Sequence, residues 1–301
     1  MNLAVITLYC NERFRAADWI RYYAEYAQAV SLHVIVNNGD SSETEFLKNS
    51  FPGSLVLESP VPNMMASYNL ALREILRRRE IDTIAQIVND IRISAADLSV
   101  LYSFLYADPH RAMVSPVLLE KDSDRIDCFG CEIERRGLDF IHRSNGLPFS
   151  VVDGREETVT GLPAGIVMAR RNIYEQIGFQ DEALFMYSDE IDMGLRAADA
   201  GYTLAVSAFA RAWHQHIYPT GKVVRSPRAA YLMGRNPVYI ARKRGDISVL
   251  RVFFHRVYVG LREMGSAIRH RKSFDCIRFG WQQVKGAFAG LWMRLPAPRN
   301  V

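Results

Sequence analysis

Short apolar segments alternate with amphipathic segments between residues 3 and 88, and this alternation restricts the fold more than any other feature. Runs rich in β-branched and aliphatic residues predict four strands, at residues 3–9, 32–40, 54–59 and 81–88. Apolar residues at helical spacing predict the intervening helices, at residues 17–30, 41–51 and 64–80. Because strands that alternate with helices form parallel sheets covered on both faces, the expected fold class is α/β, with a Rossmann-like, mostly parallel central sheet.

The second half of the α/β region has a less regular pattern. Residues 95–160 include turn-rich stretches and predict meandering strands or loops. A strand followed by a helix is expected at 161–179, a helix ended by Gly201 at 190–201, and a strand at 202–214.

The charge of the chain is divided unevenly. From Lys222 onward there are 17 basic and 3 acidic side chains, whereas the preceding residues hold 20 basic and 30 acidic ones. The last residues also show helical periodicity, so we expect an α/β domain at 1–244 and a basic, amphipathic helical extension at 245–301. No stretch approaches the roughly 20 consecutive apolar residues of a membrane-spanning helix.

Three interpretations of the extension at 245–301 are open. Its helices could pack on the core or on a partner subunit, as in a homodimer. Alternatively, its basic and apolar side chains could lie on an anionic membrane surface. Nucleic acid is the least favoured partner, because no recognised binding motif accompanies the charge.

The four cysteines give only a weak signal. Cys128 and Cys131 form the sequence C-F-G-C, which has the spacing of a redox pair or half a zinc site, but no second C-x-x-C completes such a site. Buried or free thiols are the favoured interpretation, and they indicate a reducing compartment. The N-terminal residues lack a basic region before their short apolar run and predict a strand rather than a signal peptide.

Polar residues follow the predicted strands, where parallel sheets bind their ligands. These residues are Thr7 to Glu12, Asn37 to Ser41, and Asn89 with Asp90. An acid is unfavourable in a strand, and Asp90 at a strand end is suited to a divalent cation that neutralises a diphosphate. The structural alternative is that Asp90 caps the turn that follows.

Three acids, Asp189, Glu190 and Asp192, stand at the start of a predicted helix. Acids at this position cap free N–H groups and interact favourably with the helix dipole. Two adjacent carboxylates point in different directions, however, so one can cap while the other acts as a general base. The like charge beside it would raise the pKa of that base. Asp192, one turn into the helix, is interpreted as structural.

Two histidines, His214 and His216, follow the last predicted strand of the α/β part. Histidines two residues apart on one face suit shared ligation of a metal, whereas a lone histidine is more often structural. An intermediate interpretation is a single ligand, His214, partnered by Asp90.

Together these motifs resemble the inverting family-2 glycosyltransferases of the GT-A type, especially the bacterial rhamnosyltransferase-like branch. The most specific stretch runs from GLPAGIVMARR through YSDEIDMGLRAADAG to WHQH. The other matching stretches are VITLYCNE, VIVNNGDSS, NMMASYNLAL, VNDIRIS and YLMGRNPVYIARK. The resemblance covers roughly residues 3 to 244.

The resemblance implies roles for particular residues. It implies that Glu190 is the catalytic base, with Asp189 beside it. It assigns metal binding to Asp90 and His214, and acceptor binding to Gly165. It places the nucleotide sugar against six residues, which are Thr7, Tyr9, Asn11, Asn37, Asn69 and Asn89.

Two positions depart from the family pattern. The metal-binding D-x-D motif reads Val88-Asn89-Asp90, so its first acid is missing, and Asn37 stands where an aspartate usually reads the base. The implied cofactor is Mg²⁺ or Mn²⁺, held mainly by the diphosphate and water. Weak or dispensable metal dependence is therefore left open.

The function implied by the resemblance is sugar transfer with inversion in cell-surface polysaccharide synthesis. The donor would be a dTDP- or UDP-sugar, with rhamnose favoured by the branch, and the acceptor a hydroxyl of a glycan or lipid-linked glycan. The expected location is cytoplasmic, peripheral at the inner face of the membrane. One alternative is a non-catalytic sugar-nucleotide-binding or scaffold subunit, and a nucleotidyltransferase ranks lower because TLYCNER lacks a glycine-rich phosphate loop.

Overall fold

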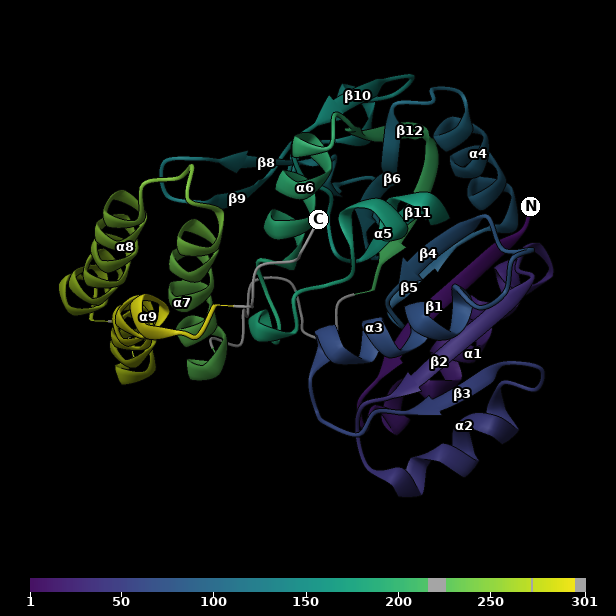
Figure 1. Ribbon diagram of the computed structural model, residues 1–301, viewed down its shortest axis with the longest axis horizontal. Coiled ribbons are helices and arrows are strands. Elements are labelled where there is room, and N and C mark those ends of the chain that lie inside the picture. The colour runs from purple at the N-terminus through teal and green to yellow at the C-terminus, as the bar shows by residue number, and fades with distance from the viewer. Residues whose placement is uncertain (216–225, 272, 296–301) are drawn as a thin grey trace. The chain divides into compact units, whose positions relative to one another are not determined.

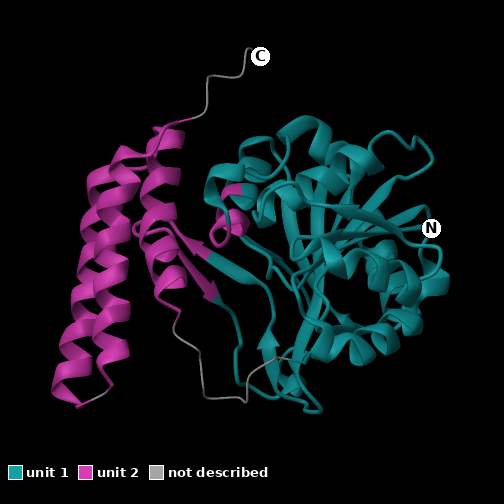
Figure 2. Ribbon diagram, turned by 90° about the horizontal axis from the view of Figure 1, so that it is seen from below, with its two compact units in different colours: residues 1–132, 142–185, 193–217 teal, residues 133–141, 186–192, 218–301 magenta. Residues whose placement is uncertain are grey.

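The computed structural model describes residues 1–215, 226–271 and 273–295. The chain divides into two compact units, drawn in teal and magenta in Figure 2. Unit 1 consists of Met1–Glu132, His142–Phe185 and Met193–Ile217, and unit 2 of Ile133–Ile141, Met186–Asp192 and Tyr218–Val301. The domain boundary expected after residue 244 stays a prediction.

Unit 1 is built on a ten-stranded sheet (Figure 1). Eight strands run in the order β10-β12-β6-β11-β4-β1-β2-β3, while β5 pairs with β12 and β7 with β6. Their bounds are β1 Leu3–Tyr9, β2 Leu32–Asn37, β3 Leu55–Glu58, β4 Thr83–Ile87, β5 Ile91–Ile93, β6 Arg111–Glu120, β7 Ile126–Cys128, β10 Glu156–Val159, β11 Ile166–Arg170 and β12 Thr203–His214. Strands β4, β1, β2 and β3 are parallel, as are β6 and β12, and β11 joins the two groups by antiparallel pairing. The predicted α/β fold is confirmed.

The helices of unit 1 connect these strands. Their bounds are α1 Ala16–Tyr26, α2 Thr44–Ser50, α3 Met64–Ile75, α4 Ala95–Tyr106 and α5 Arg171–Ile177, with short 3-10 helices at Arg13–Arg15, Ala27–Ala29, Ser41–Glu43, Phe149–Val151 and Glu182–Leu184. Helix α6 (Asp189–Asp199) begins in unit 2 and continues in unit 1. From β1 to β2 to β3 the chain proceeds in one direction across the sheet, and through α3 it then crosses back to β4 on the other side of β1. Because crossovers between parallel strands are right-handed, this reversal places α3 on the face opposite α1 and α2.

A cluster of aromatic and aliphatic side chains fixes α1 and α2 on the sheet. It consists of Tyr9, Trp19, Ile35, Leu47 and Phe51, all of them buried. The ring of Trp19 lies 4.1 Å from that of Phe51 and 5.9 Å from that of Tyr9. Because β1 and β2 both contribute to this cluster, it also fixes where the loops after these strands begin.

Helix α4 was not predicted, since residues 95–160 were expected to form strands or loops. Ser94 caps the helix by accepting a hydrogen bond from the Asp97 N–H at 3.0 Å. The helix is apolar on most of its surface, and its buried residues are Leu98, Leu101, Phe104 and Leu105. Such a sequence lacks the amphipathic period by which helices are recognised. The short strands β7 to β10 in the rest of this region agree with the prediction.

The described residues of unit 2 include the helices α7 (Pro227–Arg244), α8 (Val249–Arg269) and α9 (Phe274–Trp292). A row of glycines lets them approach closely. A Cβ at Gly234 of α7 would lie 2.1 Å from the Gln283 carbonyl oxygen, and one at Gly286 of α9 would lie 2.0 Å from that of Tyr231. Gly260 and Gly280 make the same close approach between α8 and α9. The helical character predicted for the extension is confirmed within the described residues.

A β-hairpin is also tied to α8 within unit 2. It is formed by β8 (Cys131–Glu134) and β9 (Asp139–His142), whose tip, residues 133–141, belongs to this unit. The buried guanidinium of Arg256 donates to the Gly137 carbonyl at 2.6 Å and to the Asp139 carboxylate at 2.7 Å. A buried arginine with both a carbonyl and a carboxylate partner is well compensated, so this contact fixes the hairpin tip.

None of the helices in the described residues is both long enough and apolar enough to cross a membrane.

Candidate functional site

The loops after β1 and β2 are tied to each other. Asn11 has a positive φ of 56°, and its Oδ1 accepts a hydrogen bond from the Asp40 N–H at 2.7 Å. A Cβ at Gly39 would lie 2.2 Å from the same oxygen, so only glycine fits there. The Asn37 amide donates to the Asp40 carbonyl at 2.7 Å, and its Oδ1 accepts from the Gly39 N–H at 3.0 Å. Asn11 and Asn37 therefore shape this loop pair, and their contact with a nucleotide stays a prediction.

Thr7 and Tyr9, both assigned to nucleotide binding, have buried side chains on β1. Thr7 is fully buried, with its hydroxyl 3.3 Å from Nε2 of His33. Tyr9 is also fully buried, and its hydroxyl donates to Glu43 at 2.8 Å. Burial and this bond to a carboxylate raise the pKa of Tyr9. Their side chains thus hold the end of β1, and their contact with a nucleotide stays a prediction.

Four charged residues gather beyond the ends of β4 and β12, and we call Arg15, Asp90, Asp127 and His214 the strand-end cluster. Oδ2 of Asp90 lies 3.4 Å from Nη2 of Arg15 and 3.4 Å from Nε2 of His214. The other ring nitrogen of His214, Nδ1, lies 2.9 Å from Oδ2 of Asp127. The imidazole therefore stands between two carboxylates and lies next to Asp90, while metal ligation by Asp90 and His214 stays a prediction.

The charges of the strand-end cluster stabilise one another. Burial alone would lower the pKa of His214, but hydrogen bonds and charge from Asp127 and Asp90 raise that pKa to about 9. Burial alone would raise the pKa of Asp90, but His214 and Arg15 outweigh it and lower that pKa. Near neutral pH the cluster therefore holds ionised Asp90 beside cationic His214 and Arg15. His216 lies outside the described residues.

Two further predicted residues border the strand-end cluster. Asn89 is buried, and its amide donates to the carboxylate of Glu12, which in turn lies 3.7 Å from Nη1 of Arg15. The carbonyl of Gly165 accepts from the Val88 N–H at 3.0 Å, just before the same strand end. The backbone of Gly165 thus holds the loop that carries Asn89, while nucleotide contact by Asn89 and acceptor contact by Gly165 stay predictions.

Asn69 lies elsewhere, on α3, and supports the chain ahead of the acids. Its amide is buried, donates to the Gln180 carbonyl at 2.9 Å and to the Glu182 carboxylate at 2.8 Å, and accepts from the Gln180 N–H at 2.9 Å. All three bonds hold the loop at residues 180–182. The structure thus gives Asn69 a positioning role, and its nucleotide contact stays a prediction.

Asp189 and Glu190, which we call the acid pair, follow a segment with unusual backbone geometry in unit 2. Tyr187 and Ser188 have φ values of 65° and 63°, in the left-handed region that costs about 1 kcal/mol or more for a residue with a side chain. Asn236 of α7, fully buried, holds this segment by donating to the carbonyls of Met186 at 2.9 Å and Tyr187 at 2.8 Å. The strained turn fixes where α6 begins.

The acid pair is half-buried and its two carboxyl groups are hydrogen-bonded to each other. Burial raises the pKa of Asp189 to about 6. Burial and the charge of Asp189 raise the pKa of Glu190 well above its ordinary value. Such a pair takes up its protons in two coupled steps, so it retains one proton at a pH where isolated acids have lost theirs. One carboxylate then remains to accept a proton.

Asp192 differs from the acid pair although it lies on the same helix. It is 2% exposed, and its carboxylate forms an ion pair with the ammonium group of Lys243 on α7. The ion pair offsets part of the cost of burying this carboxylate. The structural interpretation of Asp192 thus agrees with its position.

Three supporting residues were not identified from the sequence: Arg15, Asp127 and Asn236. Arg15 and Asp127 come from a 3-10 helix and a short antiparallel strand that carry no motif. Asn236 interrupts an apolar stretch of α7 beside Pro237, and a buried polar residue at such a position is a signal that could have marked it.

The strand-end cluster contains two carboxylates, those of Asp90 and Asp127, and both lie beside the ring of His214. The imidazole of His214 ligates a metal only when neutral, and because its pKa is raised, a metal would have to displace its proton. This donor set fits a Mg²⁺ or Mn²⁺ ion held mainly by a diphosphate and water.

Solved structures share this arrangement of strands and helices. GalNAc-T7 with UDP, GalNAc and Mn²⁺ is similar over 93% of this chain and 54% of its own, with a TM-score of 0.61 and 9% identity. The mannosyltransferase PcManGT from Pyrobaculum calidifontis, in complex with GDP-Man and Mn²⁺, is similar over 97% of this chain and 87% of its own, with a TM-score of 0.58 and 12% identity. The chain has the GT-A glycosyltransferase fold.

Sequence comparison adds a local similarity to this GT-A chain. N-acetylglucosaminyl-diphospho-decaprenol L-rhamnosyltransferase from two strains of Mycobacterium tuberculosis is 32% identical over 76 residues. The match spans a quarter of this chain and a quarter of the relative. No protein-family profile matches the chain. The resemblance to a rhamnosyltransferase-like branch, first inferred from motifs, is supported by this segment.

Proposed function

We propose that the protein is an inverting glycosyltransferase that transfers a sugar from a nucleotide diphosphate sugar to a hydroxyl group of a glycan or lipid-linked glycan. The observation that carries the proposal is the acid pair, with its raised pKa values, on a strained turn of a GT-A fold. Raised pKa values at strained, half-buried positions are typical of catalytic groups. The segment similar to a rhamnosyltransferase favours rhamnose carried by dTDP, with a UDP-sugar as the next candidate.

In this proposal Glu190 is the general base. It takes the proton of the acceptor hydroxyl as that oxygen attacks the anomeric carbon, and the bond to the diphosphate breaks on the opposite face. A raised pKa brings Glu190 closer to the operating pH, where a general base is most effective. Asp189, hydrogen-bonded to Glu190, tunes that pKa and orients the carboxylate.

The strand-end cluster has the charges to stabilise a departing nucleoside diphosphate. Arg15 and His214 are cationic groups beside Asp90, and preorganised cations stabilise negative charge that develops in a transition state. Asp90, together with a deprotonated His214, would hold Mg²⁺ or Mn²⁺, which would neutralise further charge on the leaving group when bound. We expect metal to increase the rate without being indispensable, because Val88-Asn89-Asp90 supplies one acid.

The variant Glu190→Gln tests the proposal. Glutamine keeps the shape of the side chain and removes the basic oxygen, so we expect transfer to fall by about 10²–10⁴-fold. The donor is first identified by a thermal-shift screen of dTDP-, UDP- and GDP-sugars with and without Mn²⁺, because a ligand that binds the folded state raises its melting temperature. Donor affinity of the variant should stay within about twofold of the original chain.

The matched control is Glu80→Gln, which makes the same change at an exposed acid. It should leave both transfer and donor affinity unchanged. Full transfer activity in Glu190→Gln would contradict the assignment of the base.

A second candidate function, a non-catalytic sugar-nucleotide-binding subunit, is favoured by one observation. Asp90 is already paired with two cations, which weakens it as a metal ligand. The two functions differ in slow donor hydrolysis, since active transferases pass sugar to water in the absence of acceptor. A bound donor that remains intact over many hours, with and without Mn²⁺, would favour the binding subunit.

We also propose that α8 and α9 place unit 2 on an anionic membrane surface at the cytoplasmic face. Both helices expose large apolar side chains, and these are Leu250, Phe254, Tyr258, Leu261, Ile268, Phe274, Trp281, Phe288 and Trp292. Exposed basic residues flank them, at Arg251, Arg262, Arg269, Arg278 and Lys285. Apolar side chains enter the lipid interface while cations bind anionic headgroups.

Sedimentation with vesicles checks the membrane contact. The double variant Phe254→Ser/Trp292→Ser should bind phosphatidylserine vesicles about tenfold more weakly, because it removes two apolar side chains that are 64% and 84% exposed. The original chain should bind phosphatidylcholine vesicles more weakly than phosphatidylserine vesicles. If the double variant keeps full vesicle binding, the membrane proposal is wrong. A dimer that dissociates in the double variant would instead assign this face to a second copy.

A further inference from the structure

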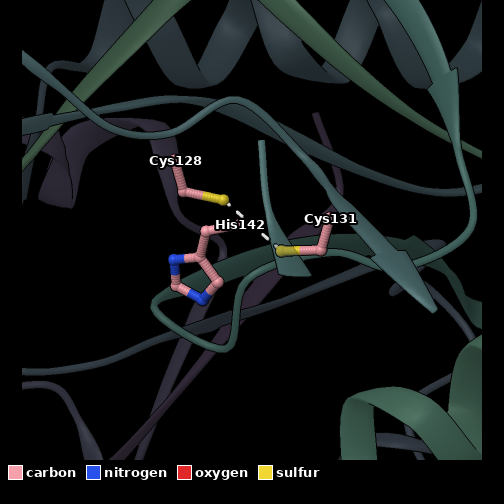
Figure 3. Close-up of side chains that lie close together, drawn as sticks. All are labelled: Cys128, Cys131 and His142. Carbon is pink, nitrogen blue, oxygen red and sulfur yellow. Dashed lines mark hydrogen bonds between the residues drawn. The ribbon is translucent and has the colours of Figure 1, made fainter. Parts of the chain in front are cut away.

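Three side chains with metal-binding chemistry lie together in unit 1 but take no part in the proposed transfer. They are Cys128, Cys131 and His142, and Figure 3 shows the two sulfur atoms directed at each other with the imidazole beside them. The sulfur atoms are 3.4 Å apart, and one ligand atom from each residue lies within 4.8 Å of the other two. Both cysteines are free thiols and fully buried, while His142 is exposed to solvent.

The backbone brings these three residues together. Gly130 between the cysteines has a φ of 74°, and a Cβ there would lie 2.6 Å from a methyl group of Val159, so the turn requires glycine. Cys131 begins β8 and His142 ends β9, so the two stand opposite each other at the open end of the hairpin. Beside them, the Arg143 N–H donates to the Gly130 carbonyl at 3.0 Å.

The distances fit a metal centre better than a disulfide. A disulfide needs sulfur atoms about 2.05 Å apart. In a tetrahedral zinc site with Zn–S bonds of about 2.3 Å, the sulfur atoms lie roughly 3.8 Å apart, which is close to the 3.4 Å observed. The imidazole of His142 is hydrogen-bonded to the Cys128 side chain and to the backbone of Asp127. Outer partners of this kind orient histidines that bind metals.

The electrostatics agree with this geometry. The thiolate is the form of cysteine that binds a metal. A buried thiolate needs a positive partner, and a divalent cation between two thiolates and a neutral imidazole would leave the centre without net charge.

We propose that Cys128, Cys131 and His142 bind one Zn²⁺ ion, with a water molecule as the fourth ligand. Two thiolates and an imidazole are ligands that select zinc over Mg²⁺ or Mn²⁺. Binding releases the thiol protons to solvent, and no electron is transferred. The water position follows from the exposure of His142, which leaves one side of the centre open to solvent.

The zinc ion would also position the strand-end cluster. Asp127 directly precedes Cys128 on β7, and its carboxylate lies 2.9 Å from the His214 ring. A metal that joins Cys128 to the hairpin fixes the end of β7, and with it the carboxylate beside His214. In this proposal the zinc ion positions the end of β7 and is separate from any cation that Asp90 holds.

The test uses the full chain without a histidine tag, depleted of metal and titrated with Co²⁺ as the probe. We expect a thiolate-to-cobalt charge-transfer absorption that saturates at one equivalent and disappears when Zn²⁺ is added. Cys131→Ser should weaken cobalt binding by at least about 100-fold, and His142→Ala by about 10-fold or more. The matched controls Cys10→Ser and Cys276→Ser should keep the absorption, as should Asp90→Asn, which removes the other candidate ligand.

A second measurement covers the case in which a cysteine variant does not fold. In the original chain, zinc should protect Cys128 and Cys131 from alkylation but leave the exposed Cys10 reactive. Absence of the charge-transfer band, or an undiminished band in Cys131→Ser, would overturn the proposal. A Cys128–Cys131 disulfide in freshly isolated, zinc-free protein would overturn it as well, in favour of a redox pair.

Discussion

The strand-end cluster and the acid pair are both groups of carboxylates, but they have opposite electrostatics. In the first, Asp90 lies beside Arg15 and His214, and these cations lower its pKa. In the second, Asp189 and Glu190 face each other, and no basic side chain of the described residues forms an ion pair with either. Their pKa values are raised instead.

This difference in pKa suits the strand-end cluster and the acid pair to different functions. A carboxylate held ionised by neighbouring cations is suited to fixing charged groups in place, because its charge does not change near neutral pH. A carboxylate with a raised pKa is suited to proton transfer, because it gains and loses a proton close to the working pH. Asp192 sharpens the contrast, since it lies on the same helix as the acid pair but has Lys243 as a partner.

The largest stability effect is expected from removing that partner. Lys243→Met removes the cation that forms an ion pair with the buried carboxylate of Asp192 and should lower the free energy of unfolding by about 3–5 kcal/mol. Urea unfolding measures the change. Lys48→Met, at an exposed lysine of α2, is the matched control and should change stability by less than about 0.5 kcal/mol. A loss below about 1 kcal/mol in Lys243→Met would mean that Asp192 is not compensated by this pair.

His214→Gln tests the strand-end cluster through pH. The folded-state pKa of about 9 lies above the ordinary value of 6.5, so the imidazolium stabilises the fold fully below pH 6.5 and this contribution is lost as the pH rises through 9. The variant should be less stable than the original chain by on the order of 3 kcal/mol at pH 6, with the difference vanishing by about pH 10.

Thermal and urea unfolding between pH 6 and 10 measure this difference. The exposed His110→Gln is the control and should leave the pH dependence of stability unchanged. If His214→Gln follows the same pH dependence as the original chain, the imidazole does not carry the charge that the cluster assigns to it.

The smallest effect is expected within the acid pair. Asp189→Asn removes the negative charge beside Glu190, so the pKa of Glu190 should fall. The acid limb of the profile of log kcat/KM against pH should then move to lower pH by about one unit, which corresponds to about 1.4 kcal/mol. Asp199→Asn, at the other end of α6, should leave the profile in place. An unmoved acid limb in Asp189→Asn would assign that limb to a group other than Glu190.

Local patterns were enough to predict much of the fold. The strands β1 to β4 were recognisable because buried parallel strands are short, continuous apolar runs. The rule that parallel strands present ligand-binding groups at one edge marked Asp90 as a candidate, and the family resemblance placed His214 with it; the two side chains lie 3.4 Å apart. Helix α4 was not predicted, because its own apolar residues occur on most of its surface and give no amphipathic period.

The partners within the site were less predictable. Asp127 reaches His214 across 87 residues of sequence, and this contact depends on the antiparallel pairing of β7 with β6. Asn236 reaches the Met186 carbonyl across 50 residues. The His142 imidazole joins Cys128 and Cys131 only through the register of a hairpin. Contacts of this kind are set by tertiary packing, and no local periodicity of the sequence predicts them.

The close approach of α7, α8 and α9 has a consequence for how the sequence of unit 2 can vary. Gly286 and Gly290, one helical turn apart on α9, face the backbone of α7 so closely that even a methyl group would meet a carbonyl oxygen, at 2.0 Å and 2.5 Å. Natural variation at these two positions should therefore be almost absent, whereas the large exposed side chains of the same helix should drift. A comparison of α9 among related sequences would then show, from the positions that do not vary, which of its residues contact the other helices.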